Sequence, residues 1–305
     1  GEAHRVGLAP CIAADGAGSV VREALLAQAG CQSGTEWLEH GYKELCIPPS
    51  PDGGFRMDPN ALHIWPRGGY MLIALPNLDG SFTLTLFLGN EGDPGFDSLD
   101  TPESVRGFFE RDFPDAAALL PDLEAEFFAN PTGILGTVRS YPWNAGGSVC
   151  LLGDAAHAVV PFHGQGMNAA FEDCLEMDRC LEEYGTDWET VFDRFCERRK
   201  PNADAIADMA LENYVEMRAS VTDPRYLLKK RLAFELERRH PDRFVPRYSM
   251  VMFRDDIGYA DAQRRGRLQE SILDEATAGH DDLANIDLDA LDERIHLQLT
   301  PLTVE

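Results

Sequence analysis

The sequence predicts an α/β chain with α+β elements, and three observations support this fold class. Residues 149–152 are a short apolar run of the kind found in strands buried on both faces, and a helix is expected to begin near Met167. Residues 8–14 are a second apolar run, followed by an Asp-Gly turn and a helix-compatible segment at 20–29. Between them, residues 41–140 carry mostly strand patterns and turn signals. The chain therefore reads as two strand-turn-helix segments separated by an inserted antiparallel sheet.

The inserted segment is predicted to contain both strands and helices. Thr101 precedes Pro102, which places a capping residue before a proline at the first helical position. The expected strands are 42–47, 61–65, 70–75, 82–88 and 134–140, and the expected helices are 101–111 and 116–129.

The second half of the chain is predicted to be helical. Pro161 bars helix in the segment before residue 167, and Pro201 is expected to interrupt the helical pattern that follows. From Gly279 onward the chain is acidic and reads as a short helix or a loose tail. The expected helices are one running from Met167 past Leu181, then 188–199, 203–218, 224–239 and 253–278.

Composition excludes several classes of protein. The chain has 305 residues, 44% of them hydrophobic, which suffices for a core, and its formal net charge is −25. Nucleic acid and anionic membrane surfaces would repel such a chain. No apolar run is long enough for a membrane span, and the start of the chain lacks the order of a secretory signal, so no membrane anchor is predicted.

The seven cysteines indicate a reducing compartment. They are scattered without a CxxC pair, and Cys11, Cys150 and Cys174 lie in apolar or helical contexts, which predicts reduced core thiols. We therefore expect a cytoplasmic protein.

The stretch 141–174 predicts a flavin site. Gly153-Asp154 ends the buried strand, and Gly164-Gln165-Gly166 provides a loop whose backbone can approach a ligand closely. The amino end of the next helix would then favour an anionic or electron-rich group, such as a reduced flavin. Asp15 ends the earlier strand in a similar way, at the position where α/β folds bind ligands. The alternative is that Asp15 and Ser19 merely cap a turn and a helix.

Other chemistries have weaker support. His157 and His163 lie across a proline-bearing loop without a carboxylate or thiolate at zinc spacing, so no metal site is predicted. Neither a GxSxG elbow nor a GxxxxGK[ST] loop occurs, which argues against a serine hydrolase and an NTPase. His163 is either a substrate contact or a solvated loop histidine.

The helix expected at 203–218 has an apolar face with two polar exceptions. Asn213 and Glu216 lie on or beside a stripe that includes Ile206 and Met209. A polar group that faces a core must be paired, so these two side chains either contact a ligand or lie at the edge of solvent.

Several motifs together resemble a known family. They are ADGAGSVVR, HIWPR with the following ALPN turn, GDAAHAVVPFHGQGMNAAFEDC, NYVEMR at 213–218 and FVPRYSMV at 244–251. They are similar to the aromatic-ring hydroxylase group of FAD-dependent flavoprotein monooxygenases, and within it to the kynurenine 3-monooxygenase family. The resemblance extends from about residue 6 to residue 251. It implies an enzyme that uses FAD, NADPH and O2 to hydroxylate the aromatic ring of L-kynurenine.

The resemblance also assigns site residues. No catalytic side chain is expected, because the flavin does the chemistry. It implies cofactor contacts by Asp15, Gly16, Gly153, Asp154, Pro161, Gly164, Gly166, Met167 and Asn168. It implies substrate contacts by Phe87, Phe162, His163, Asn213, Glu216, Met217 and Tyr248, with Pro161 close to both groups. A planar aromatic amino acid needs apolar walls and a few oriented polar groups, which this set supplies.

The predicted organisation is part of a Rossmann-like FAD-binding domain with an inserted antiparallel substrate sheet and a C-terminal helical region. The family begins with a GxGxxG motif, which does not occur here, so we expect a fragment of a longer enzyme. The expected segments are 1–40 (the C-terminal part of the first FAD-binding segment), 41–140 (substrate sheet), 141–200 (returning FAD-binding segment), 201–280 (helical cap) and 281–305 (acidic tail). Alternatives are a hydroxylase for another aromatic substrate and a non-catalytic remnant that binds a ligand or partner. A homodimer is one assembly that the resemblance allows.

Overall fold

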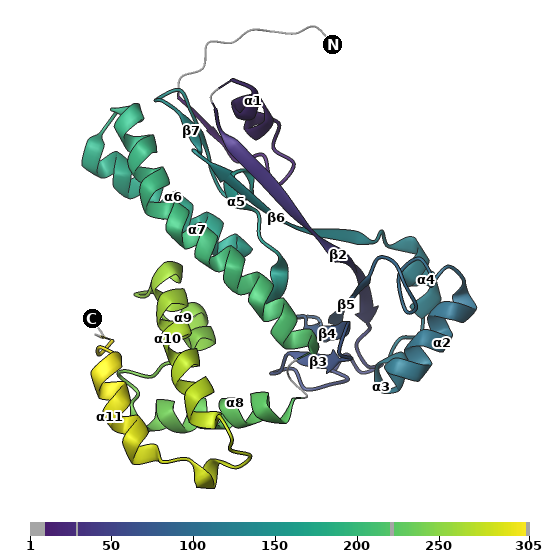
Figure 1. The fold of residues 1–305 in the computed structure, drawn as a ribbon. Coiled ribbons are helices and arrows are strands. Elements are labelled where there is room, and N and C mark those ends of the chain that lie inside the picture. Colours follow the sequence, from purple (N-terminus) through teal and green to yellow (C-terminus); the bar gives the residue numbers. More distant parts are fainter. Residues whose placement is uncertain (1–9, 29, 220–222, 303–305) are drawn as a thin grey trace, which may run out of the picture. The chain divides into compact units, whose positions relative to one another are not determined.

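The computed structural model describes residues 10–28, 30–219 and 223–302, and the chain divides into two compact units (Figure 1). Unit 1 comprises Gly1–Glu36, Thr137–Asn213 and Asp223–Glu305, and unit 2 comprises Trp37–Gly136 and Tyr214–Thr222. Three elements pass from one unit to the other, namely β2 (Gln32–Ile47), β6 (Gly133–Tyr141) and α7 (Trp188–Ala219). The predicted α/β fold class is confirmed.

Unit 1 contains a small three-stranded sheet, in which the two predicted buried strands are neighbours. The strands are β1 (Cys11–Ala13), β7 (Asn144–Ala145) and β8 (Val149–Leu151), in the order β1-β8-β7. β1 pairs in parallel with β8, and β8 pairs in antiparallel with β7. Positions 8 and 9 of the first predicted strand lie outside the described residues.

Helices make up most of the rest of unit 1. Its core includes the fully buried rings of Trp143, Phe192 and Phe195. Besides α7, the helical elements are α1 (Val20–Gln28), α5 (Asp154–His157), the 3-10 turn η1 (Pro161–His163), α6 (Gly166–Tyr184), α8 (Pro224–Arg239), α9 (Arg247–Phe253), α10 (Tyr259–Thr277), the 3-10 turn η3 (Leu283–Asn285) and α11 (Leu288–Gln298).

The expected break at Pro201 is wrong, because α7 continues through it as one helix. A proline inside a helix costs about 3 kcal/mol, since its ring crowds the preceding turn and it has no N–H to donate. Apolar side chains on both sides of Pro201 are fully buried, among them Phe195 and Ile206. Their burial stabilises the continuous helix and offsets the cost of the proline.

The segment between β8 and α6 also differs from the prediction. The segment before residue 167 was expected to contain no helix, yet it forms the single turn α5 and the 3-10 turn η1. Pro161 is the first residue of η1, where a missing N–H leaves no hydrogen bond unmade.

The C-terminal helices differ from the prediction in one place, and the acidic run forms the short helix that was one of its two interpretations. The expected helix 253–278 begins only at Tyr259, and the separate helix α9 ends at Phe253. The acidic tail contains the helix α11, whose residues Leu291 and Ile295 are buried in an apolar cluster with Leu232 and Ile272. The apolar spacing within the acidic run thus outweighs its charge.

Unit 2 is built on the predicted antiparallel sheet. β3 (His63–Pro66), β4 (Met71–Pro76) and β5 (Phe82–Gly89) join β2 and β6 in the order β3-β4-β5-β2-β6. β5 pairs with both β2 and β4 in antiparallel. β2 begins at Gln32, ten residues before the predicted start. The prediction missed this part because residues 32–41 are mostly polar and exposed and show no strand alternation.

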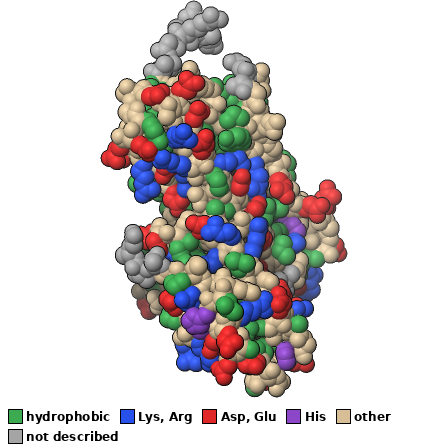
Figure 2. Space-filling view, turned by 60° about the vertical axis from the view of Figure 1, so that its left-hand side comes forward, with side chains coloured by type: hydrophobic (Ala, Val, Ile, Leu, Met, Phe, Trp, Pro, Cys, Tyr) green, Lys and Arg blue, Asp and Glu red, His purple; other side chains and the backbone are tan. Residues whose placement is uncertain are grey.

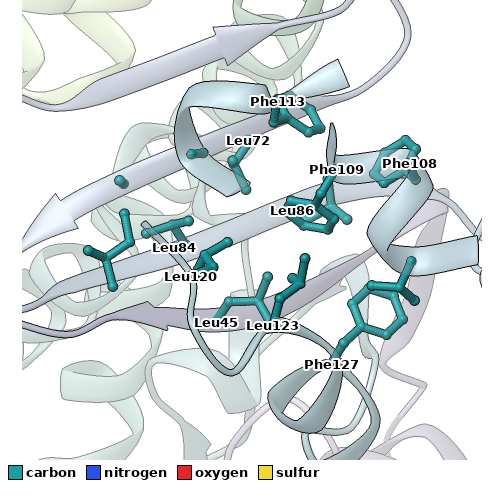
Figure 3. Packing of buried hydrophobic residues seen from close by; sticks show 14 of the residues in the cluster. Leu45, Leu72, Leu84, Leu86, Phe108, Phe109, Phe113, Leu120, Leu123 and Phe127 are labelled. Carbon is teal, nitrogen blue, oxygen red and sulfur yellow. The ribbon is translucent and has the colours of Figure 1, made fainter. Parts of the chain in front are cut away.

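Three helices cover one face of this sheet, α2 (Pro102–Asp112), α3 (Pro114–Ala117) and α4 (Leu123–Ala129). Figure 3 shows strand residues such as Leu84 and Leu86 facing the rings of Phe109 and Phe113. The predicted cap is confirmed, since the Thr101 side chain accepts a hydrogen bond from the Ser104 N–H. The single helix expected at 116–129 is wrong.

That expected helix is divided by a turn that contains Pro121. α3 ends at Ala117 and α4 begins at Leu123, so Pro121 lies between two short helices. A proline disfavours helical backbone in the residue before it, which ends the first helix before Pro121.

The HIWPR motif has a structural role in unit 2. The indole N–H of Trp65 donates to Asp115 at 2.7 Å, and the Arg67 guanidinium lies over the Phe113 ring at 4.8 Å. Arg67 Nε also donates to the carbonyl of Asp112 at 2.7 Å. The motif therefore holds strand β3 and the residue after it against the end of α2 and against α3.

The surface combines both signs of charge despite the net charge of −25. On the face drawn in Figure 2, acidic and basic side chains are interspersed.

All seven cysteines are free thiols, but Cys174 is exposed, so its expected place in the core is wrong. No helix within the described residues is long and apolar enough to cross a membrane.

Candidate functional site

The two aspartates predicted to bind a cofactor follow neighbouring parallel strands. Ala13 of β1 pairs with Leu151 of β8, so the carboxyl ends of both strands lie at one edge of the sheet. Asp15 follows the first strand and Asp154 follows the second. Ligands of open α/β sheets bind at this kind of edge.

Asp15 caps helix α1. Its Oδ1 accepts from the Ser19 hydroxyl at 2.5 Å, and its Oδ2 accepts from the Val20 N–H at 2.9 Å. The hydrogen bond from Ser19, together with the backbone donors, holds the pKa of Asp15 below its ordinary value. Asp15 and Ser19 thus cap the turn and the helix, as the alternative interpretation proposed. Contact of Asp15 and Gly16 with a cofactor stays a prediction.

Gly153 and Asp154 form a tight exit from strand β8. Gly153 has φ of 61°, a left-handed value, and a Cβ there would meet the Ala170 side chain at 3.2 Å. Glycine therefore allows α6 to pack close to the end of the strand. Asp154 is exposed, and its carboxylate has no hydrogen-bond or ion-pair partner within the described part of the chain. That carboxylate is available to accept from a ligand hydroxyl.

The amino end of α6 presents backbone donors. The helix begins at Gly166 after a left-handed Gly164, it has no side-chain cap, and its first turn contains no acidic residue. The first N–H groups of a helix have no acceptor within the helix. Met167 and Asn168 are exposed there, with Met167 at 68%. These donors and the helix dipole suit an electron-rich group such as a reduced flavin ring, so the residues present fit FAD.

The turn Pro161–His163 is held by two helices of unit 1. The Asn213 side-chain amide of α7 donates to the Phe162 carbonyl at 2.6 Å. His163 is buried and its ring stacks on Tyr248 of α9, with ring centroids 5.4 Å apart. The interpretation of His163 as a solvated loop histidine is therefore wrong. Four predicted substrate residues, Phe162, His163, Asn213 and Tyr248, come together in this unit.

The other three predicted substrate residues belong to unit 2. Phe87 is buried in β5, where it pairs with Tyr42 of β2 and Met71 of β4. Glu216 and Met217 lie half-buried near the end of α7. Asn213 is buried, so the interpretation of a solvent-edge Asn is wrong. Contact of these residues with a substrate stays a prediction.

A buried ionic network centred on Asp173 was not predicted. Its carboxylate accepts from the Gly153 N–H at 2.9 Å, from His157 Nε2 at 2.6 Å and from Arg199 Nε at 2.7 Å. Asp173 is fully buried on α6, and Arg199 also donates to the Ala169 carbonyl at 3.1 Å. The network joins the strand end at Gly153 to α6. A carboxylate on the buried face of a predicted helix was the available signal.

Arg22 is a second residue that sequence reasoning missed. It is buried on α1, and its guanidinium donates to the Ala17 carbonyl at 2.5 Å and to the Ala155 carbonyl at 2.8 Å. It thus ties the Asp-Gly turn to the Gly-Asp turn. Its position, three residues after Ser19, was visible in the sequence, but its partner 133 residues away was not.

Comparison with known proteins agrees with this geometry. Residues 1–210 match the family described as FAD binding domain, and the chain belongs to this family. The chain is 52% identical over 299 residues to kynurenine 3-monooxygenase of Stenotrophomonas maltophilia (strain K279a) and 50% identical over 291 residues to that of Myxococcus xanthus (strain DK1622). These matches confirm the resemblance that the motifs indicate.

The matches cover a larger share of this chain than of its relatives. They include 98% and 95% of this chain, which spans 65% and 62% of the lengths of these two relatives. Among solved structures, the tetrameric form of 2-methyl-3-hydroxypyridine-5-carboxylic acid oxygenase matches with a TM-score of 0.56 at 21% identity, covering 72% of this chain and 58% of that one. A probable FAD-dependent monooxygenase from Pseudomonas aeruginosa matches with a TM-score of 0.54 at 20% identity, covering 68% and 56%. These likenesses show a shared fold.

Proposed function

We propose that this protein is an FAD-dependent monooxygenase that consumes NADPH and O2 and hydroxylates L-kynurenine to 3-hydroxykynurenine. The support for this substrate is the identity of about half of the aligned residues with proteins named kynurenine 3-monooxygenase. When bound, FAD supplies the oxygen-activating chemistry, with NADPH as the source of electrons.

The observation that carries the proposal is the amino end of α6. Its uncapped N–H groups lie after a left-handed Gly164, and Met167 and Asn168 are exposed at the same end. We assign these donors to the electron-rich edge of the flavin ring, which gains negative charge on reduction. Asp154 accepts from a hydroxyl of the ribityl chain, and Asp15 lies at the same sheet edge.

The residues around η1 are assigned to the substrate. The stacked rings of His163 and Tyr248 and the buried Phe162 supply apolar surface for an aromatic ring. Asn213 orients this turn through its bond to the Phe162 carbonyl. In unit 2, we assign Phe87 and Met217 to apolar contacts and Glu216 to the substrate amino group. Apolar side chains around the reacting ring would also exclude water.

The test uses protein produced from the full coding sequence and purified with FAD. NADPH oxidation is measured with and without L-kynurenine, and the product is separated by chromatography. We expect kynurenine to stimulate oxidation and 3-hydroxykynurenine to accumulate. 4-Hydroxybenzoate serves as the matched aromatic acid, and stimulation by it alone would favour a hydroxylase with another substrate. Bound FAD with no kynurenine-dependent rate would refute the proposal.

We also propose a cytoplasmic protein and a homodimer. Seven free thiols and the acidic surface suit a reducing aqueous compartment. Sedimentation velocity at several protein concentrations tests the assembly, and a single species at monomer mass would contradict the dimer.

A further inference from the structure

Gln165 lies in the loop 164–166, which leads into α6 and is assigned to the flavin. It is buried at the N-cap position of α6, between Gly164 and Gly166 of the predicted cofactor set. Its Oε1 accepts from Asn168 Nδ2 at 3.0 Å and from the Tyr259 hydroxyl at 3.0 Å. Its Nε2 faces the Met252 sulfur at 3.1 Å. Two donors on one side of the amide and a thioether on the other fix its orientation.

Tyr259 is a firm anchor for this amide. It is the first residue of α10, and only 4% of its surface is exposed, in an apolar cluster that includes Ala169 and Met250. The next N–H, that of Ala260, donates to the Asn202 side chain of α7 at 3.0 Å. The tyrosine ring and the start of its helix are therefore held independently of Gln165.

The hydroxyl of Tyr259 remains a donor at any physiological pH. Burial raises the pKa of Tyr259, and the neighbouring Glu172 carboxylate raises it further, while Arg199 opposes this effect. The hydroxyl proton is therefore available to Gln165 Oε1 at 3.0 Å, and the Glu172 carboxylate is the second acceptor near it.

The contact between Gln165 and Tyr259 links the part of the chain that matches the FAD binding domain to the C-terminal helices beyond that match. The match to the FAD binding domain ends at residue 210, whereas Tyr259 and Met252 belong to the C-terminal helices α10 and α9 (Figure 1). These helices contact the loop at the amino end of α6 through the buried Gln165 amide, and Met250 and Tyr259 also lie in one apolar cluster with Ala169 of α6. Asn168, which this amide holds, is exposed and is one of the predicted flavin contacts.

We propose that Tyr259 is a positioning residue for the cofactor, which acts through Gln165 to hold Asn168 and the amino end of α6 in the orientation that binds the flavin ring. The inference rests on the proposed function, since it takes FAD as the ligand of this loop. It makes the C-terminal helices part of the cofactor site.

The experiment is an FAD titration of the full-length apoprotein, followed by flavin fluorescence and by the fine structure of the visible absorption band. Tyr259→Phe removes only the hydroxyl and keeps the buried ring. We expect its dissociation constant for FAD to rise about five-fold, the equilibrium equivalent of one net hydrogen bond. Gln165→Met removes the acceptor at similar side-chain length and is expected to weaken binding at least as much.

Tyr184→Phe is the matched control. It also removes a bonded hydroxyl, that of Tyr184 to Glu183 at 2.6 Å, but at the last residue of α6, about 27 Å along the helix from Gly166. We expect less than a two-fold change for this variant. Circular dichroism of each variant verifies that it is folded.

The decisive comparison is the double variant. If Tyr259 acts through Gln165, Tyr259→Phe has no further effect on FAD affinity in the Gln165→Met background. An unchanged FAD affinity for Tyr259→Phe, a loss no larger than that of the control, or equal losses in both backgrounds would overturn the inference. Protein that binds FAD without hydroxylating kynurenine would refute the proposed function, and the same titration would still decide this one.

Discussion

The carboxylate of Asp173 offers the sharpest test of how the site is held together. It is completely buried, and it accepts hydrogen bonds from Gly153, His157 and Arg199 at 2.6 to 2.9 Å. The substitution Asp173→Asn keeps the shape but removes the charge, and it turns an NH2 group toward one of these donors. Arg199, with a side chain only 6% exposed, then loses its closest counter-charge.

The magnitude follows from this geometry. Removing one partner of a buried ion pair costs about 3–5 kcal/mol, because the remaining charge stays buried. Arg199 keeps the partly exposed Glu172 at 2.8 Å, so we expect the lower end, about 3 kcal/mol of unfolding free energy. Urea unfolding followed by circular dichroism measures it. Asp178→Asn, an exposed carboxylate on the same helix, is the control and should change stability by less than about 0.5 kcal/mol.

The pH dependence gives this prediction a second readout. Burial alone would raise the pKa of Asp173, but hydrogen bonding and charge from His157 and Arg199 outweigh it and lower the pKa. A depressed pKa contributes stability above the unfolded value of about 3.9, and that contribution is lost as pH falls through the folded value. The difference between wild type and Asp173→Asn should be complete at pH 7 and narrow below about pH 4. If Asp173→Asn were as stable as the Asp178→Asn control at pH 7, the buried carboxylate would not stabilise the fold.

Three further predictions concern the site and the C-terminal helices. Asp154→Ala should weaken FAD retention during dialysis without lowering the melting temperature, because the exposed carboxylate has no partner within the described chain; unchanged flavin content would contradict its role. Asn213→Ala and Glu216→Gln should raise the kynurenine concentration needed for stimulation while FAD stays bound, and loss of flavin would mean that this helix serves the cofactor instead. Arg239 and His240 lower the pKa of Asp292 to about 2. Asp292→Asn should therefore be less stable than wild type at pH 7, and this difference in stability should shrink as the pH falls from about 4 to 2. A difference that does not depend on pH would argue against a stabilising interaction of Asp292 with Arg239 and His240.

Much of the fold could be predicted where local signals agreed with burial. The Thr101-Pro102 cap, the strand before Gly153 and the start of α6 depend on residues close in sequence, and all three predictions are confirmed. Errors arose where packing overrode local preference, as in the continuous helix through Pro201. The early start of β2 was missed because its first residues are polar and exposed, so their pairing left no apolar pattern.

The site could be predicted only where characteristic turn residues follow a predicted strand. Asp15 and Asp154 stand next to glycines at strand ends, and their neighbouring parallel strands bring them to one edge. Asp173 and Tyr259 could not be assigned in this way, because their partners lie 16 to 94 residues away and only the fold brings them together. A buried polar side chain on a helix signals that a partner exists but does not identify it.

The most direct test of the central claim is the origin of the oxygen atom in the product. The full-length protein with bound FAD is supplied with NADPH, L-kynurenine and oxygen-18 gas, and the product is analysed by mass spectrometry. We expect 3-hydroxykynurenine that carries one oxygen-18 atom and forms only when FAD, NADPH and kynurenine are all present. NADPH oxidation that yields only peroxide, or a product without the label, would contradict the proposed reaction.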